Sequence, residues 1–150
     1  KTIGDLAGPM AFAILMGSSR AFYGKFGDKI NLERFMQYSA VLCMVSYLMI
    51  AFIPVPALGI LGCAVCGLSV GIMWPGTFSM AAASVKRGGT ALFALLALAG
   101  DVGCSSGPTY VGMISGALND NLKLGIFAAL IFPVLMIMGI KMIGSLQKYD

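Results

Sequence analysis

The chain has 150 residues, of which 59% are hydrophobic and 11% are charged, and its mean hydropathy is +0.92. A soluble domain of this length cannot bury so much apolar surface, which excludes a soluble monomer, and a disordered chain is excluded for the same reason. The ten cations behind the net charge of +4 are scattered, so they do not form the basic cluster of a nucleic-acid-binding protein. This composition favours the lipid bilayer as the surrounding medium.

The sequence offers little catalytic chemistry. It contains no histidine, which excludes an imidazole base, a histidine-containing triad and histidine metal ligands. Cys63 and Cys66 have the spacing of a redox or zinc motif, but they lie inside an apolar run without a second pair. We interpret them as small, reduced packing residues, and we predict no enzymatic activity, no metal site and no cofactor.

Hydropathy predicts an all-α membrane protein with five transmembrane helices in one compact bundle. The helices are expected over residues 6–24, 35–53, 57–84, 90–116 and 122–143. A helix of about 20 apolar residues crosses the ~30 Å hydrocarbon core of a bilayer. The runs are too long and too continuous for the alternating strands of a membrane barrel.

The first two predicted helices differ in polarity. Residues 6–24 include Arg20, which lies ~6 Å from the end of that helix at ~1.5 Å per residue, so that its guanidinium can extend to the membrane interface. Residues 25–34 form the only charge-rich loop. Residues 35–53 carry no charge between their ends, as do residues 122–143, and we expect both helices to be peripheral.

The third and fourth predicted helices carry polar features at depth. In residues 57–84, Trp74 lies ~15 Å from the C-terminal end, and Pro75 predicts a kink because it removes a backbone hydrogen bond and frees a carbonyl. In residues 90–116, Asp101 lies ~16 Å from the start, and Ser105 and Thr109 share its helix face. Such a stripe faces a partner or water rather than lipid. Asp101 either belongs to a solute or ion path or only holds neighbouring helices together.

Small residues predict close helix packing. Glycines spaced four apart let two helix backbones approach each other. The three pairs are Gly67 and Gly71, Gly103 and Gly107, and Gly112 and Gly116.

The positive charges predict an orientation. Cytoplasmic ends of spanning helices are enriched in lysine and arginine. One set of ends carries eight cations and the other carries only Lys1 and Lys123. The eight are Arg20, Lys25, Lys29, Arg34, Lys86, Arg87, Lys141 and Lys148. We therefore expect a multi-pass protein of the plasma (inner) membrane with its N-terminus outside and its C-terminus in the cytoplasm.

Three stretches together resemble the C-terminal half of a major facilitator superfamily (MFS) transporter. Residues 17–29 are similar to the basic loop after the second helix of a three-helix repeat in that family. Residues 71–79 resemble the tenth helix of sugar permeases such as the fucose-permease group, and residues 99–108 resemble the eleventh. The resemblance implies that the five helices correspond to the eighth to twelfth of the family. It also implies a partner outside this chain, the N-terminal half of the same transporter.

The family loop differs here in two places. Lys25 and Phe26 stand where the family has an acid and a base, and Asp28 stands at a basic position. The resemblance nevertheless implies a gating loop, made of Arg20, Lys25, Gly27, Asp28 and Lys29.

These features together predict a secondary active transporter that works by alternating access. Our candidates for the substrate site are Trp74, Thr77, Asp101, Ser105 and Thr109, with Asp101 as the proton-coupling group. The expected solute is a sugar, another polar metabolite or a drug. The alternative is a non-transporting membrane subunit that packs through its glycine-rich helix faces.

Overall fold

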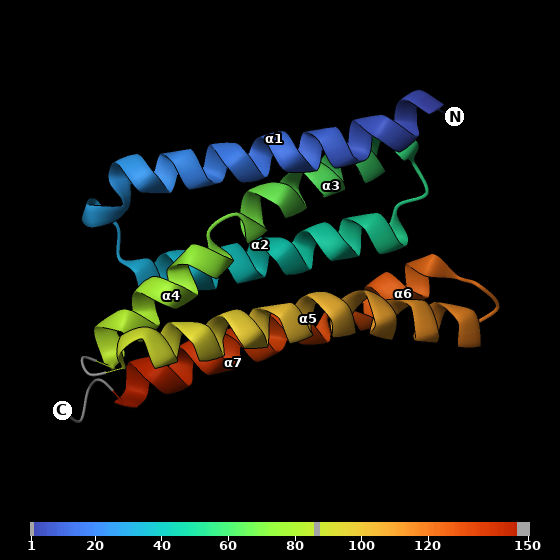
Figure 1. Cartoon of the computed structure of the whole chain (residues 1–150). Coiled ribbons are helices and arrows are strands. Elements are labelled where there is room, and N and C mark those ends of the chain that lie inside the picture. Colours follow the sequence, from blue (N-terminus) through green and yellow to red (C-terminus); the bar gives the residue numbers. More distant parts are fainter. Residues whose placement is uncertain (1, 86–87, 147–150) are drawn as a thin grey trace.

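The structure is a computed structural model that describes residues 2–85 and 88–146, with side chains described from residue 6 onward except at 28 and 146. The described residues form helices and turns and contain no strand. The elements are α1 (Thr2–Phe26), the 3-10 turn η1 (Gly27–Lys29), α2 (Leu32–Phe52), α3 (Pro56–Val70), α4 (Met73–Ser84), α5 (Gly89–Ala117), α6 (Leu122–Ala128) and α7 (Ile131–Leu146). The helices run side by side, and the start of α1 and the end of α7 lie at opposite ends of the bundle (Figure 1).

Four segments are long and apolar enough to cross a membrane: Leu32–Phe52, Pro56–Ser84, Gly89–Ala117 and Leu122–Ser145. The prediction of an all-helical, multi-span chain is therefore confirmed at this level. The first predicted span, which corresponds to α1, has the length of a span but is not among the four, and Ser18, Ser19 and Arg20 lie within it. Of the cations that predict the orientation, Lys1, Lys86, Arg87 and Lys148 lie outside the described residues.

Two predicted helices are each divided into two pieces. The third ends as α3 at Val70 and resumes as α4 at Met73, shortly before Pro75. The fifth, which we expected to be continuous, is divided in the same way shortly before Pro133. Proline has no backbone N–H and its ring collides with the carbonyl four residues earlier, so each break lies where that collision falls.

Polar residues define the helix starts after two loops. The side chain of Asn31 accepts a hydrogen bond from the amide of Arg34 at 3.2 Å and caps α2. Asn121 caps α6 in the same way. The turn before α6 needs positive φ at Asn119 (58°) and Asp120 (57°), a conformation that these residue types tolerate better than most.

The closest helix pair is α1 with α3, and glycine makes it possible. A Cβ at Gly67 would lie 2.8 Å from the Cα of Phe12, and one at Gly71 would lie 2.8 Å from the carbonyl oxygen of Met16. Close packing is therefore confirmed for the first glycine pair. The four glycines of the other two pairs meet no described heavy atom within 4 Å of a Cβ: Gly103, Gly107, Gly112 and Gly116.

The helix that we expected at the periphery, α2, lies at the centre of the bundle. It contacts α3, α4, α6 and α7. Small buried side chains at Ala40, Cys43 and Ser46 let neighbouring helices approach it. Met36 adds a buried cluster with Met80 of α4 and Ile140 of α7. An apolar surface on every side of a helix fits burial among other helices as well as contact with lipid, which is why the sequence pattern misled us.

Candidate functional site

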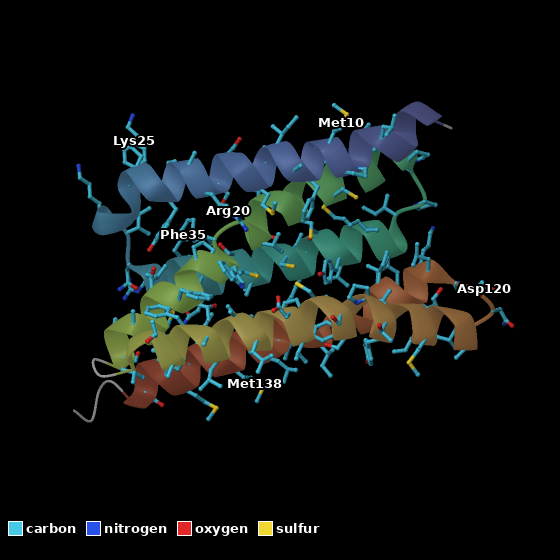
Figure 2. The ribbon with its side chains drawn as sticks, viewed as in Figure 1. Met10, Arg20, Lys25, Phe35, Asp120 and Met138 are labelled. Atoms are coloured by element: carbon cyan, nitrogen blue, oxygen red, sulfur yellow. The ribbon has the colours of Figure 1, made fainter. Side chains whose placement is uncertain are left out.

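The break between α3 and α4 is held by a side chain from α1. Pro75 cannot donate to the carbonyl of Gly71, four residues earlier. Arg20 supplies the missing donor, since its Nε donates a hydrogen bond to the Gly71 carbonyl at 3.1 Å. In Figure 2 Arg20 points from α1 toward the start of α4. The extension of this side chain to the membrane interface stays a prediction, and the structure adds that its Nε binds to the backbone of another span.

Trp74 lies in the first turn of α4, directly after the break. Its ring lies 4.4 Å from that of Phe78, which stacks on Phe93 of α5 at 5.7 Å between centroids. The indole Nε1 lies 3.1 Å from the position of a Cβ at Gly100, so α5 approaches the ring closely because residue 100 has no side chain. Trp74 remains 54% exposed.

Asp101, Ser105 and Thr109 lie together on an exposed face of α5. They line an open hollow of about 610 Å³ with Val102, Ser106, Tyr110 and Met113. The Ser105 hydroxyl donates to the Asp101 carbonyl at 3.0 Å, and the Thr109 hydroxyl donates to the Ser105 carbonyl at 2.7 Å. Both hydroxyls thus use their hydrogen within α5 and present only lone pairs to the hollow.

The carboxylate of Asp101 forms no ion pair and accepts no hydrogen bond from the residues that the structure describes. Arg20 in particular is engaged at Gly71. Asp101 is close to the middle of the 29-residue helix α5. A carboxylate at that depth needs water or a partner outside the described bundle, because lipid cannot solvate it.

Thr77 does not join the other four candidates. Its hydroxyl donates to the Met73 carbonyl at 2.7 Å. Its side chain lines a separate cavity of about 210 Å³ between α2, α4, α5 and α7, which is otherwise formed mainly by methionine, leucine and isoleucine. Trp74 is not among the residues that line the Asp101 hollow. Its indole approaches α5 at Gly100, which precedes Asp101 in the chain.

The residues of the predicted gating loop are spread along α1 and η1. Lys25 and Lys29 are exposed, and Lys25 points away from the bundle in Figure 2, with its Nζ 5.6 Å from the ring of Phe26. Gly27 lies against the ring of Tyr23. The side chain of Asp28 lies outside the described residues. Arg20 is separated from this group by its bond to Gly71.

Sequence reasoning missed a third hollow, of about 470 Å³, between α1, α2 and α3. Its lining combines aromatic, aliphatic and hydroxyl side chains: Ser18, Ser19, Phe22, Phe35, Tyr38, Ser39, Leu42 and Leu68. The available signal was the pair of serines before Arg20, which are unusual within an apolar run.

The cysteines take part in none of these hollows. All four are free thiols, with Cys43 and Cys66 buried, Cys63 half-buried and Cys104 exposed. The described residues hold no group of three or more histidine, cysteine, aspartate or glutamate side chains that could bind a metal ion.

The arrangement around Asp101 suits reversible binding. A carboxylate beside hydroxyl lone pairs can accept a proton or hydrogen bonds from a hydroxyl-rich solute, and an indole can stack on an apolar ring face. The chain matches no protein-family model, no curated protein and no solved structure. Function is therefore inferred from this geometry.

Proposed function

We propose that the protein is a secondary active transporter that moves a small solute by alternating access. The observation that carries the proposal is the carboxylate of Asp101, which lies midway along a spanning helix without a partner among the described residues. It shares an open hollow of about 610 Å³ with Ser105 and Thr109. Ionisable groups at such depth are costly in lipid and belong as a rule to solute or ion paths.

Asp101 is the proton-coupling group in this proposal. Its carboxyl group is the one side chain of the stripe with Ser105 and Thr109 that exchanges a proton in the ordinary pH range, since hydroxyl groups of serine and threonine do not. The solute binds between this stripe and Trp74, and its class is a sugar, another polar metabolite or a drug.

The broken span supports the same proposal. Discontinuous helices near the bilayer midplane are common in transporters. Here α3 and α4 are separated by Gly71 and Ile72, whose backbone stays in the right-handed helical region, and Trp74 follows two residues later. Together with the resemblance to the eighth to twelfth MFS helices, it suggests that a second bundle, the N-terminal half, completes the cavity. The orientation follows the cations, with the η1 end of the bundle in the cytoplasm of a cell bounded by the plasma (inner) membrane.

The test compares Asp101→Asn with wild type in proteoliposomes that contain the complete transporter. Asparagine keeps the size and hydrogen bonding of the side chain but does not titrate. We expect proton-driven accumulation of the solute to be lost while solute exchange across the membrane persists. Asp120→Asn, in the exposed turn before α6, is the matched control and should accumulate normally. Near-normal uphill uptake by Asp101→Asn would exclude Asp101 from coupling.

One observation favours a second candidate, a non-transporting subunit of a membrane complex. Four glycines of α5, Gly103, Gly107, Gly112 and Gly116, meet no described atom within 4 Å of a Cβ, so a partner helix could pack there. In that case Gly107→Cys would form a cross-link to another membrane chain, and no solute flux would accompany the complex. Saturable flux with no such cross-link favours the transporter.

A further inference from the structure

We propose that the hollow beside Asp101 recognises a protonated organic amine, a small cation that carries N–H donors and an apolar part. The proposal rests on the proposed transport function, because it names the solute class for the same site. The volume of the hollow, about 610 Å³, lies in the range of small-molecule sites, ≈ 300–1,000 Å³. Its charge and its hydrogen-bonding groups narrow the solute classes that the sequence left open.

The hollow carries one negative charge and no positive one. Asp101 is the single carboxylic acid among the seven lining residues, and none of the seven is a lysine or an arginine. No side chain in the described part of the chain donates a hydrogen bond to this carboxylate. An uncharged sugar would leave the carboxylate without a counter-charge midway along a spanning helix, where such a charge is costly. A cation removes this cost, whereas an anion is repelled.

The polar side chains that follow Asp101 along its own helix face can only accept hydrogen bonds from a ligand. The hydroxyls of Ser105 and Thr109 donate their hydrogens to carbonyls of α5 and present lone pairs to the hollow. Ser106 and Tyr110 carry hydroxyls that either donate or accept, so no lining side chain is an obligate donor. The ligand therefore supplies the hydrogens. A protonated amine does so through its N–H groups, whereas a quaternary ammonium ion has none.

The lining residues form two neighbouring rows along α5, and these rows limit the length of the ligand. The distance from residue 101 to residue 113 is ~18 Å along the helix axis at ~1.5 Å per residue. The first row consists of Asp101, Ser105 and Thr109, and the second consists of Val102, Ser106, Tyr110 and Met113.

The end of the hollow away from Asp101 offers apolar contacts. Tyr110 packs there against Phe132 of α7, with 5.6 Å between the ring centroids and an angle of 81° between the ring planes. Met113 lies three residues farther along α5 and is 71% exposed. An aromatic ring and a flexible thioether pack against apolar groups of varied shape. The ligand therefore places its ammonium group at Asp101 and extends its apolar part toward Tyr110.

The first experiment measures the charge preference of the hollow through a cysteine at position 105. In the complete transporter without native cysteines, Ser105→Cys is reacted with a cationic and an anionic methanethiosulfonate reagent. Each rate is divided by the rate of the same reagent with a free thiol. One helical turn, ~5.4 Å, separates residues 101 and 105, so we expect the cationic reagent to be favoured about tenfold. The preference should disappear when Asp101→Asn is added. Equal normalised rates would overturn the proposal, because a cation of the protein itself would then already neutralise Asp101.

The second experiment compares ligands of matched shape and different charge. Phenethylamine is a cation at neutral pH, 2-phenylethanol is its uncharged counterpart, phenylacetate is an anion, and glucose represents the sugars. Each compound is tested for its ability to slow the reaction of Ser106→Cys with N-ethylmaleimide, which is uncharged. We expect phenethylamine to protect the thiol at a concentration at least about tenfold lower than 2-phenylethanol, and phenylacetate and glucose to give no protection.

Two variants show whether this protection depends on the carboxylate. Asp101→Asn should abolish the advantage of phenethylamine over 2-phenylethanol. Asp120→Asn, in the exposed turn before α6, is the matched control and should keep it. Equal or better protection by 2-phenylethanol or glucose, or no protection by phenethylamine, would overturn the proposal without any use of the Asp101→Asn variant.

Binding and transport are measured separately, so this proposal and the transport function fail in different ways. Protection by phenethylamine without any proton-driven accumulation would support the amine site and contradict the transport function. Proton-driven accumulation of glucose, with no protection by phenethylamine, would support the transport function and overturn the amine site.

Discussion

The Nε of Arg20 donates to the carbonyl of Gly71 at 3.1 Å, across 51 residues of chain. The acceptor is the carbonyl that Pro75 leaves without a helical donor. A side chain of α1 thus replaces a backbone hydrogen bond within another span, and a long-range contact substitutes for a local one.

Removal of Arg20 should destabilise the bundle. Hydrogen bonds to charged groups contribute ≈ 1.5–3 kcal/mol, and Arg20→Ala should lower the free energy of unfolding by about this amount. Arg34→Ala is the matched control, since the Arg34 side chain is exposed and should contribute little. Unfolding in mixed detergent micelles, followed by helical circular dichroism, measures both. Equal stability of the two variants would contradict this role of Arg20.

The same contact predicts coupling between Arg20 and Pro75. In a Pro75→Ala background the amide of residue 75 becomes able to donate to Gly71, so Arg20→Ala should be less destabilising there than in wild type. A double-mutant cycle measures the difference. Strictly additive effects would mean that Arg20 does not act through the carbonyl freed by Pro75.

Alanine at Gly67 should separate α1 from α3. The new Cβ would overlap the backbone of Phe12, and overpacking typically costs 1–3 kcal/mol. Gly59→Ala, in the same helix, meets no described atom within 4 Å and should be neutral or slightly stabilising. Thermal unfolding in detergent compares them. Similar melting temperatures for the two variants would disprove the close approach at Gly67.

Alanine at Gly100 should displace the indole of Trp74. The added Cβ would lie 3.1 Å from Nε1, so the ring must shift away from α5. Trp74 is the single tryptophan of the chain, so the fluorescence spectrum reports on it alone. We expect Gly100→Ala to change the emission maximum or quenching by iodide, whereas Gly103→Ala, with open space at its Cβ, leaves both unchanged. Identical spectra would show that the ring does not lie against Gly100.

The face of α5 that carries Asp101 should be accessible to water, whereas the outer face of α7 should be covered by lipid. In a background without native cysteines, Ser105→Cys should react readily with a charged methanethiosulfonate reagent. Met138 lies in the middle of α7 and points away from the bundle (Figure 2). A cysteine in its place (Met138→Cys) should react slowly, because lipid excludes the charged reagent. Slow reaction at Ser105→Cys would mean that lipid or another helix covers this face.

Local chemistry explains how much of the fold could be predicted from the sequence. The long apolar runs predicted helices of spanning length, and proline and asparagine marked several of their boundaries. Pro75 indicated the kink in the third span, and Pro133 carried the same signal in the fifth, where it was overlooked. The shared face of Asp101, Ser105 and Thr109 follows directly from helical spacing.

Contacts between distant segments could not be predicted in this way. Helical spacing does not say which neighbour a face meets, so the partner of Arg20, the central position of α2 and the separation of Thr77 from Asp101 appear only in three dimensions.

The break between α3 and α4 divides one span into two mechanical parts. α3 is fixed to α1 by glycine contacts with its backbone, whereas α4 meets α5 mainly through aromatic rings and a bare glycine. A torque on α4 would therefore be absorbed at Gly71 and Ile72, and Trp74 would swing past α5 while α3 stayed in place. Arg20 restrains this joint from outside, because its hydrogen bond to Gly71 ties α1 to the residues that join α3 and α4.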